Sequence, residues 1–462
     1  MKAVELKNIY FRYKGFKEII LKNVNMEALY GEITLLAGMS GSGKSTILNL
    51  ITGIIPNIIK GDIKGEILIN NENIIGKSIS EISKMVGVVL QNADSQIIMP
   101  HVEEEIAFGL ENINMERLNI KNKINEICNI LSLNKDSKCK TLSGGEKQRL
   151  MSGAILAMGQ KIIILDEPLA NIDKFGAKIL LDVLKNLKNE GYAIIIIEHR
   201  LDMLIKYIDK IYDIKNGILN EIDNINKYLD DEKNIIKDNG IKIESNEKIY
   251  EVNNLIYKIK DRKIINNISF DINEGERVLI LGENGKGKTT LVRLLSKMIK
   301  PTEGEIKQYI TNKRKNWFDN VGIVYQNPNY QLFMPTVEKE ILYNAKSKEL
   351  AYELLNKFDL DKYKNRHPLS LSEGEKRKLT VALVLARLPK VLFLDEPTVG
   401  QDYDNLLNMI NIINEFRNKY KTTIITISHD IRCANSLCDK CIILDNELKI
   451  GNKELIDEFF RR

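Results

Sequence analysis

A glycine-rich segment at residues 38–46, Gly-Met-Ser-Gly-Ser-Gly-Lys-Ser-Thr, constrains this chain more than any other stretch. It fits the pattern G-x-x-x-x-G-K-S/T in full, follows the apolar run 33–37 and precedes an apolar helix that begins at Thr46. Its glycines let successive backbone N–H groups point at one anion, and the helix start adds partial positive charge. The segment therefore predicts a phosphate-binding loop between a strand and a helix.

Two side chains of this loop have defined tasks at a nucleotide site. Lys44 is placed to reach the β- and γ-phosphates, and the Ser45 hydroxyl to hold Mg²⁺, so ATP and Mg²⁺ are the predicted cofactors. The alternative, a glycine-rich turn with a chance lysine, requires the flanking strand and helix to be accidental as well. The predicted nucleotide contacts of this loop are Gly38, Ser40, Gly41, Gly43, Lys44, Ser45 and Thr46.

The same loop returns in the second half of the chain, which indicates an internal duplication. Residues 282–289 read Gly-Glu-Asn-Gly-Lys-Gly-Lys-Thr after the apolar run 278–281, and Lys288 lies 244 residues beyond Lys44. Its predicted nucleotide contacts are Gly282, Asn284, Gly285, Gly287, Lys288, Thr289 and Thr290. Three more motifs recur in the same order, namely glutamine segments at 91–96 and 326–331, Asp-Glu-Pro at 166–168 and 395–397, and the histidines His199 and His429.

Each copy alternates continuous apolar runs, such as 161–165 and 193–197, with helical stretches. Runs of this kind are typical of strands that are buried on both faces of a parallel sheet. The segments 91–142 and 326–371 have a more polar, helical periodicity, which predicts a helical subdomain inserted into each core. We therefore expect an α/β fold with two nucleotide-binding domains in tandem, each built on a mostly parallel sheet.

The length of 462 residues fits two domains, which we place at 1–222 and 248–462 with a polar linker at 223–247. A net charge of +5 is too mild to indicate nucleic acid, and the basic cluster 313–315 fits a solvated loop better than a phosphate contact. The chain shows no leader-like start and no apolar run of ~18 residues. We expect a cytosolic protein that reaches a membrane only through partners.

The cysteines favour reduced thiols over disulfides. There are five of them, Cys128, Cys139, Cys433, Cys438 and Cys441, an odd number in a large chain without secretory features. The spacing of the last three could suggest a zinc or iron–sulfur site. However, no second cluster matches them, and they run into the apolar strand 441–444.

A pair of carboxylates ends a predicted apolar strand in each copy. Asp166 at the strand tip can support Mg²⁺, and Glu167 beside it can polarise the water that attacks the γ-phosphate. Asp395 and Glu396 repeat the arrangement. Simple capping of a strand end would explain one carboxylate, but not the same pair in both copies.

Two of the four histidines, His199 and His429, follow the last long apolar strand of each copy. A histidine at this place can contact the γ-phosphate and so distinguish ATP from ADP. One such histidine alone would more often be an ordinary strand-end residue, and the matched pair favours the functional interpretation. His101 and His367 have no counterparts in the other copy and are expected to be structural or surface residues.

The segment 142–149 reads Leu-Ser-Gly-Gly-Glu-Lys-Gln-Arg and lies upstream of Asp166. A serine and two glycines at a helix start form a second anion-binding surface, with a plain helix cap as the alternative. Phosphate loop, glutamine segment, this string, Asp-Glu-Pro and histidine, in this order and twice over, resemble the ATP-binding cassette (ABC) ATPases. The resemblance covers nearly the whole chain except the linker, and it implies two ABC domains that hydrolyse ATP.

In that family two cassettes close head to tail on two ATP molecules, which implies that the two halves of this chain form a pseudo-dimer. One site would combine Lys44, Ser45, Gln91, Asp166, Glu167 and His199 with Ser372, Glu373 and Gly374. The other would combine Lys288, Thr289, Gln326, Asp395, Glu396 and His429 with Ser143, Gly144 and Gly145. The implied Mg²⁺ ligands are Ser45, Gln91, Asp166, Thr289, Gln326 and Asp395, and the implied catalytic residues are Glu167, Glu396, His199 and His429.

The chain departs from the family pattern at three places. Glu373 stands where the family usually has glycine, and a carboxylate there would repel the γ-phosphate of the first site unless it points away. Lys286 adds a compensating positive charge to the second loop. Tyr13 fits the adenine-stacking aromatic of the family, whereas Ile259 takes that position in the second copy, with Tyr257 two residues earlier.

The glutamine segments narrow the resemblance. Each carries a second glutamine, Gln96 or Gln331, followed by Met-Pro and Val-Glu. This is similar to the ATPase subunits of energy-coupling factor importers, which take up vitamins and transition-metal ions. The resemblance implies a position at the cytoplasmic face of the membrane. It also implies a transmembrane coupling subunit and a small substrate-binding membrane protein as partners, and no nucleic acid.

Two other classes share parts of the pattern. A soluble tandem ABC ATPase that acts on ribosomes typically has a longer, charged helical linker or a basic tail, and the fused ATPase of a sugar importer lacks the second glutamine. A DNA-repair ATPase of this kind would need long heptad repeats or zinc modules between the phosphate loop and the Leu-Ser-Gly-Gly-Glu string, and neither is present. We therefore expect the motor of an importer.

Overall fold

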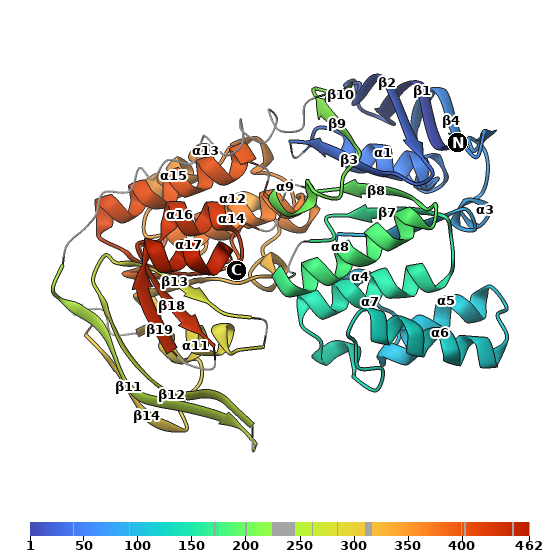
Figure 1. Cartoon of the computed structure of the whole chain (residues 1–462). Helices are drawn as coiled ribbons and strands as arrows, with labels where there is room; N and C mark the ends of the chain where they lie inside the picture. Colours follow the sequence, from blue (N-terminus) through green and yellow to red (C-terminus); the bar gives the residue numbers. More distant parts are fainter. Residues whose placement is uncertain are drawn as a thin grey trace. The chain divides into compact units, whose positions relative to one another are not determined.

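The structure is a computed structural model, which describes residues 1–39, 41–91, 93–169, 172, 174–198, 201–223, 245–260, 262–283, 285–309, 317–398, 400–401, 403–445 and 448–461. The chain divides into two compact units, Met1–Lys233 and Asn234–Arg462 (Figure 1). The predicted domains 1–222 and 248–462 fall in different units, and most of the predicted linker lies outside the described residues. Among the described residues we find no helix with the length and apolar character that a membrane span requires.

Unit 1 is built on two sheets within its described residues. The six-stranded sheet has the order β10-β9-β3-β8-β7-β6, and its neighbours are parallel except for β10 and β9. The four-stranded sheet, in the order β2-β1-β4-β5, is antiparallel. The strands are β1 (Lys2–Tyr13), β2 (Leu21–Leu29), β3 (Ile33–Gly38), β4 (Gly61–Ile69), β5 (Glu72–Asn73), β6 (Val86–Val89), β7 (Ile162–Asp166), β8 (Ala193–Ile197), β9 (Lys210–Lys215) and β10 (Ile218–Glu221).

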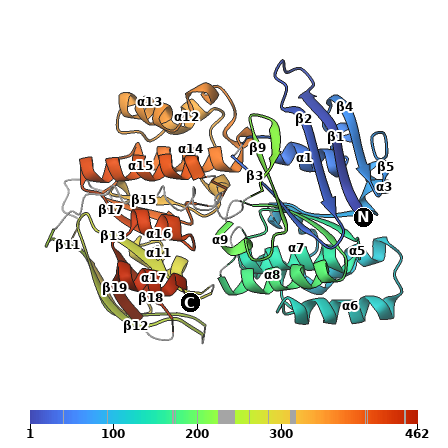
Figure 2. The ribbon, with the colours of Figure 1, turned by 45° about the horizontal axis from the view of Figure 1, so that its top comes forward.

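The central strands of this sheet are apolar because both of their faces are covered. Every residue of β8 is buried, and in β7 only Asp166 at the carboxyl end is partly exposed. Alternate side chains of these strands belong to two cores, one shared with β1, β2, β4 and α1 and the other with α8. The ribbon in Figure 2 shows α1 and α8 on different sides of these strands. The helices outside the helical subdomain are α1 (Lys44–Ile51), α2 (Ile54–Asn57), α3 (Ile79–Ser83), α8 (Lys174–Asn189) and α9 (Leu201–Leu204).

A helical subdomain is inserted between β6 and β7, as predicted. It has its own apolar core, which includes Val102, Ile106 and Leu150. Its helices are α4 (Ala93–Gln96), α5 (Val102–Asn112), α6 (Arg117–Ile130), the short 3₁₀ helix η1 (Cys139–Thr141) and α7 (Gly144–Ala157). Since α7 contributes Met151 to the core under the parallel sheet, this helix joins the subdomain to the nucleotide-binding core.

Unit 2 repeats this architecture within its described residues. Its six-stranded sheet has the order β15-β16-β17-β13-β18-β19, parallel except for the edge strand β19, and its antiparallel sheet has the order β12-β11-β14. The strands are β11 (Lys248–Ile259), β12 (Arg262–Asn273), β13 (Arg277–Leu281), β14 (Glu303–Gln308), β15 (Val321–Val324), β16 (Val391–Asp395), β17 (Thr423–Ile427), β18 (Lys440–Leu444) and β19 (Leu448–Asn452). The predicted tandem α/β fold is confirmed.

The helices of unit 2 also follow the order of unit 1. They are α11 (Lys288–Leu295), η2 (Trp317–Asp319), η3 (Pro328–Tyr330), α12 (Val337–Leu342), α13 (Lys348–Lys357), η4 (Asp361–Tyr363), η5 (Pro368–Ser370), α14 (Glu373–Leu385), α15 (Tyr403–Tyr420), α16 (Ile431–Leu437) and α17 (Lys453–Arg461). One apolar core lies between β11, β12, α11 and the parallel sheet, and another includes α14, α15 and α16. The second phosphate loop is therefore supported from the same sides as the first.

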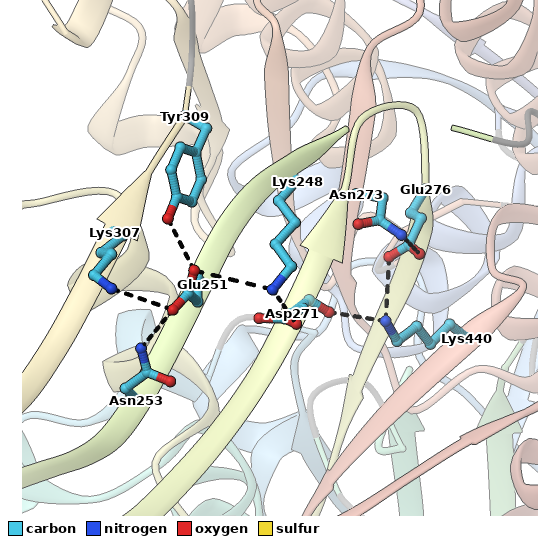
Figure 3. Close-up of polar contacts among 9 residues, drawn as sticks. All are labelled: Lys248, Glu251, Asn253, Asp271, Asn273, Glu276, Lys307, Tyr309 and Lys440. Carbon is cyan, nitrogen blue, oxygen red and sulfur yellow. Dashed lines mark hydrogen bonds and ion pairs between the residues drawn. The ribbon is translucent and has the colours of Figure 1, made fainter. Parts of the chain in front are cut away.

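A polar cluster braces the antiparallel sheet of unit 2 (Figure 3). The Glu251 carboxylate accepts hydrogen bonds from Asn253 Nδ2 at 2.8 Å, Tyr309 Oη at 2.8 Å and Lys307 Nζ at 3.3 Å. These bonds lower the pKa of Glu251 to about 2. The cluster thus joins β11 to β14 and to the residue that follows β14.

The cluster continues toward the parallel sheet. Lys248 Nζ lies 2.8 Å from Asp271 Oδ2, and Lys440 Nζ on β18 donates to the Asp271 carbonyl oxygen at 2.8 Å and to Glu276 Oε2 at 3.3 Å (Figure 3). Unit 1 has the same kind of cluster on β1 and β2, formed by Lys2, Glu5 and Glu27. The duplication therefore extends to the polar surface of the antiparallel sheets.

Replacing Glu251 with Gln removes the charged acceptor from this cluster. Because the folded-state pKa lies below the ordinary value of 4.5, the carboxylate stabilises the fold above about pH 4.5 and loses this effect as the pH falls toward 2. We expect Glu251→Gln to have a lower thermal unfolding midpoint than the wild type at pH 7. This difference between the two midpoints should become smaller below pH 4.5. The exposed Glu247 provides the control Glu247→Gln, and a difference that does not change with pH would contradict the assignment.

Candidate functional site

The two phosphate loops follow the same backbone course. Both begin with a glycine whose φ is positive, 136° at Gly38 and 143° at Gly282. A Cβ atom would lie 2.5 Å from the Ile214 carbonyl oxygen at the first position and 2.3 Å from the Leu444 carbonyl oxygen at the second. Only glycine fits there, because the loop turns directly beside the neighbouring strand. The predicted contacts Ser40 and Asn284 lie outside the described residues.

The loop lysines are held inside the loops by backbone oxygens. Lys44 Nζ donates to the carbonyl oxygens of Gly38 at 2.7 Å and Met39 at 2.8 Å. Lys288 Nζ donates to those of Gly282 at 2.7 Å and Glu283 at 3.0 Å. Each ammonium group is therefore fixed at the centre of its own loop, by the same pair of contacts in both copies.

The remaining parts of each loop fit an anion. The first helical residues are Lys44 in α1 and Lys288 in α11, and within the described residues neither helix start receives a side-chain capping bond. A Cβ at Gly41 or Gly285 would meet nothing within 4 Å, so the space in front of each loop is open. A central lysine, uncapped helix N–H groups and open space are what a nucleotide phosphate requires.

Two of the three predicted Mg²⁺ ligands of the second copy, Thr289 and Asp395, lie together. Thr289 Oγ1 donates to Asp395 Oδ2 at 3.4 Å, at the carboxyl end of β16. Burial raises the pKa of Asp395, while the positive charges of Arg377 and Lys288 oppose this rise. In the first copy Asp166 ends β7 and Ser45 is exposed on the first turn of α1. An oxygen donor set of this kind suits Mg²⁺.

The two predicted catalytic glutamates have an unusual backbone conformation. φ is 47° at Glu167 and 48° at Glu396, in the left-handed region. Their N–H groups donate to the carbonyl oxygens of Ile197 at 2.8 Å and Ile427 at 2.9 Å, at the ends of the neighbouring strands. The left-handed conformation costs roughly 1–2 kcal/mol for a residue of this type. The two glutamates therefore share one strained backbone conformation at the same strand end of both copies.

Partners of these glutamates include other predicted site residues. Gln91 Nε2 donates to Glu167 Oε2 at 2.8 Å. His429 N donates to Glu396 Oε2 at 3.3 Å, and His429 Nε2 lies 3.7 Å from Glu396 Oε1. The structure thus brings the glutamine and glutamate together in the first copy and the glutamate and histidine together in the second. His199 lies outside the described residues.

The Leu-Ser-Gly-Gly-Glu string and its second version both start a helix with a capping box. Glu146 N donates to Ser143 Oγ at 3.3 Å, and Ser143 N donates to Glu146 Oε2 at 2.8 Å. Ser372 and Glu375 repeat both bonds. Gly144, Gly145 and Gly374 lie in the first turns of α7 and α14. The serines are therefore helix caps, as the plain-cap alternative to an anion-binding surface predicts. The cap also orders the first turn of each helix and thereby the direction of its backbone N–H groups.

Two charges that depart from the family pattern have partners in their own unit. Glu373 Oε1 lies 2.8 Å from Lys376 Nζ, one turn along α14. Lys286 Nζ lies 3.3 Å from Asp445 Oδ1, just beyond β18. The Glu373 carboxylate is thus compensated locally by Lys376, whereas Lys286 pairs with a different carboxylate.

The aromatic predicted to stack on adenine lies beside the first loop. Tyr13 Oη is 3.0 Å from Thr46 Oγ1 at the start of α1. In the second copy, Ile259 is exposed at the end of β11, and Tyr257 is partly buried against the core. Thr290 occupies the third position of α11. An aromatic at the position of Tyr13 is therefore confined to the first copy.

The second glutamine of each glutamine segment holds the segment to its own strand. Gln96 Oε1 accepts from Leu90 N at 2.7 Å, and its Nε2 donates to the Val88 carbonyl oxygen at 3.2 Å. Gln331 Oε1 accepts from Tyr325 N at 3.0 Å, and its Nε2 donates to the Ile323 carbonyl oxygen at 2.8 Å. We call this pair of bonds the glutamine clamp. Sequence reasoning used these glutamines only as a family mark and missed this role.

Two buried glutamates were also missed. Glu105 Oε2 accepts from the N–H groups of Ile98 at 2.9 Å and Met99 at 2.7 Å. Glu340 accepts in the same way from Phe333 N at 2.9 Å and Met334 N at 2.7 Å. Both carboxylates are about 5% exposed or less, so each binds the turn after its glutamine segment without competition from water. Their matched spacing in the two copies was the available signal.

The cysteines and the other two histidines, His101 and His367, are not among the predicted residues of the nucleotide sites. All five cysteines are free and buried, and burial raises the pKa of the Cys441 thiol. Among the residues that the structure describes, no group of three His, Cys, Asp or Glu side chains could hold a metal ion. His101 precedes α5 and lies 3.2 Å from Glu104, and the His367 ring accepts from Leu369 N at 3.2 Å.

Comparisons with known proteins agree on one family. The family model described as ABC transporter matches residues 21–170 and 265–399. The chain is similar to YkoD of Bacillus subtilis, a protein named for HMP/thiamine import and ATP binding, with 31% identity over 95% of this chain and 89% of that protein. It is also similar to an ABC transporter ATP-binding protein of Treponema denticola, with 31% identity over 96% of this chain and 95% of that one.

Solved structures share the two-unit architecture. A model of ribosome-bound archaeal Pelota and ABCE1 contains a chain with a TM-score of 0.75 and 22% identity, which covers 98% of this chain and 80% of that one. The RNase-L Inhibitor gives a TM-score of 0.69 and 21% identity, with coverage of 98% and 92%. At these identities the likeness concerns the fold.

Removing the glutamine clamp of the second copy should loosen the site. Gln331→Ala leaves Tyr325 N and the Ile323 carbonyl oxygen without this partner, and we expect the free energy of unfolding of unit 2 to fall by ~1–3 kcal/mol. Urea denaturation followed by intrinsic fluorescence measures the change. Tyr330→Ala is the control, because that neighbouring side chain is 77% exposed. Equal stability of Gln331→Ala and the wild type would show that the clamp contributes nothing.

Proposed function

Because the chain belongs to the ABC transporter family of ATPases, we propose that it is the ATP-hydrolysing motor of an importer of the energy-coupling factor type. It binds at the cytoplasmic face of the membrane to a transmembrane coupling subunit, with a small substrate-binding membrane protein as a further partner. Vitamins and transition-metal ions are the proposed cargo classes. A soluble ATPase acting on ribosomes is the alternative.

The observation that carries this proposal is an exposed apolar surface at the glutamine segment of unit 2, with an exposed isoleucine at the matching place in unit 1. In unit 2, Tyr330, Phe333 and Tyr343 are 77%, 65% and 58% exposed, and the rings of Phe333 and Tyr343 meet edge to face at 5.8 Å. In unit 1, Ile98 takes the place of Phe333 and is 66% exposed. Exposed apolar side chains on a turn that is fixed from behind favour a protein partner.

The relatives support the import direction. YkoD, named for HMP/thiamine import, resembles this chain over nearly its whole length. A small water-soluble vitamin is a cargo that a membrane partner must recognise, since among the described residues the proposed sites are all directed at nucleotide. The choice of cargo is therefore assigned to that partner.

The residues of each site divide the work of ATP hydrolysis. Lys44 and Lys288 hold the terminal phosphates, while Asp166 and Asp395 with the loop hydroxyls hold the cation. Mg²⁺ bound there supplies charge neutralisation of the phosphates. Glu167 and Glu396 accept the proton of the attacking water, and their fixed left-handed backbone sets the direction of the carboxylate. We propose that each loop is completed by the Ser-Gly string of the other cassette, as the family implies.

The two sites should differ in rate. In the proposed pairing, Glu373 faces the first loop and Gly144 the second. Lys376 Nζ lies 2.8 Å from Glu373 Oε1, and its positive charge reduces the repulsion between Glu373 and a γ-phosphate. The first site would still have this ion pair at the place where the second site has a glycine with its backbone N–H group. The second loop is therefore assigned the faster turnover.

Substituting the catalytic glutamates tests this difference. We expect Glu396→Gln to lower ATP turnover by roughly 10²-fold or more and to trap ATP, and Glu167→Gln to have a smaller effect. Phosphate release and retained nucleotide are measured for each variant, with Glu349→Gln on the exposed start of α13 as the control. Equal losses in the two variants would refute the unequal rates.

Membrane association tests the importer role. The full chain, expressed in its own host with a purification tag, is expected to co-purify with membrane proteins, and Phe333→Ser should weaken this association severalfold while leaving ATP binding intact. Tyr352→Ser is the control, because Tyr352 is also an exposed aromatic of the helical subdomain. Co-purification with ribosomes in place of membrane proteins would overturn the proposal and favour the alternative.

A further inference from the structure

Arg377, on the second turn of α14, reaches from the Ser-Glu-Gly helix to the glutamine segment of the same unit. Its Nη1 donates to the Tyr325 carbonyl oxygen at 2.5 Å, and its Nη2 donates to the Gln326 carbonyl oxygen. The side chain is 2% exposed. Two charge-assisted bonds from one planar group thus fix the backbone at Tyr325 and Gln326, in addition to the glutamine clamp at Ile323 and Tyr325.

The charge of Arg377 is buried near three carboxylates of its own unit. Burial lowers the pKa of Arg377 to about 10, and the carboxylates of Asp395, Glu373 and Glu396 oppose this, in that order. A guanidinium keeps its charge inside a protein, so its burial requires compensation by nearby negative groups. Arg377 therefore lies where its charge acts on both strand-end carboxylates as well as on the loop.

The first copy makes this connection differently. Gln148 stands at the position of Arg377 and is equally buried, and within the described residues its Nε2 has no hydrogen-bond partner. The helix and the glutamine segment are joined instead by Lys147 and Asp94, whose charged atoms are 2.5 Å apart. The Asp94 side chain is 60% exposed, and an exposed ion pair holds two segments together only weakly.

The substitutions at these positions belong together. Asn329 replaces Asp94 in the second copy, so the lysine of the helix, Lys376, has lost its acidic partner on the loop and pairs with Glu373 at 2.8 Å. The connection between helix and loop passes to Arg377. Three changes, at Asn329, Glu373 and Arg377, thereby exchange an exposed ion pair for a buried clamp.

We propose that Arg377 is a positioning residue of the second ATP site, which holds Gln326 against α14 in a fixed place for the bound cation. This rests on ATP binding by the second loop, as in the proposed function, and not on import. Because Arg377 binds the Gln326 carbonyl oxygen and the clamp holds the preceding residue, Tyr325, the Gln326 side chain needs little further ordering when the cation binds. The first site has the Gln96 clamp but no equivalent of Arg377 among its described residues.

Hydrogen exchange on the full chain tests this without turnover. We expect Arg377→Gln, which gives the second copy the residue of the first, to raise amide exchange in 325–331 by roughly tenfold without nucleotide, and to leave 90–96 and the core of β16 unchanged. Arg377→Lys, which keeps the charge and one bond, should restore part of the protection. Arg387→Gln is the matched control, since Arg387 donates to the Phe318 carbonyl oxygen at 3.0 Å on an exposed part of unit 2.

Binding of a fluorescent ATP analogue at varied Mg²⁺ gives the second readout. Arg377→Gln is expected to raise the Mg²⁺ concentration for half-maximal binding severalfold, in a background where Lys44→Ala silences the first loop. Unchanged exchange in 325–331, or exchange that rises equally throughout α14 and β16, would overturn the proposal. A Lys44→Ala protein that binds no nucleotide would contradict the proposed second site itself, so the two failures are distinguishable.

Discussion

Adjacent parallel strands that end at one edge of a sheet are the constraint on which each site depends. Leu36 of β3 and Asp166 of β7 both pair with Ile197 of β8. The register with this one strand therefore places the start of the phosphate loop and the Asp166 carboxylate at the same edge of the sheet. In unit 2, Ile427 of β17 does the same for β13 and β16. These registers are stable because apolar side chains cover both faces of each parallel sheet. A slip by one residue would move every side chain of a strand to the opposite face of the sheet.

Around this shared frame the two copies differ mainly in how their loops are joined to neighbouring helices. The lysine contacts inside the phosphate loops and the left-handed glutamates are the same in both copies. The contacts of Lys147, Lys376 and Arg377 are not. The two copies thus agree in the phosphate loops and the strand-end glutamates. They differ in that Lys147 and Lys376 pair with carboxylates at different places and Arg377 binds backbone.

The sequence was informative wherever a feature is local. The parallel sheets and the helical subdomains follow from apolar periodicity, and the phosphate loops from glycine positions that no other residue can occupy. Arg377 was missed because its partner, the Tyr325 carbonyl oxygen 52 residues away in the chain, is set by tertiary packing. Gln96 and Glu105 bind backbone that is six and seven residues away, and the recurrence of both residues in the second copy was the available signal. The simple capping role of Ser143, one of the two interpretations of its string, is present in the structure, and the anion-binding role stays a prediction.

The glutamine clamp separates the shape of a turn from the chemistry of its surface. Gln96 and Gln331 make the same two bonds to strand backbone. The three residues that precede them nevertheless differ, Ala-Asp-Ser before Gln96 and Pro-Asn-Tyr before Gln331. A turn whose course is set at its ends can exchange its outward side chains at little cost in stability. In the proposed importer, one duplicated chain would therefore present two different recognition surfaces on a common backbone, which would suit it to a partner that is not itself symmetric.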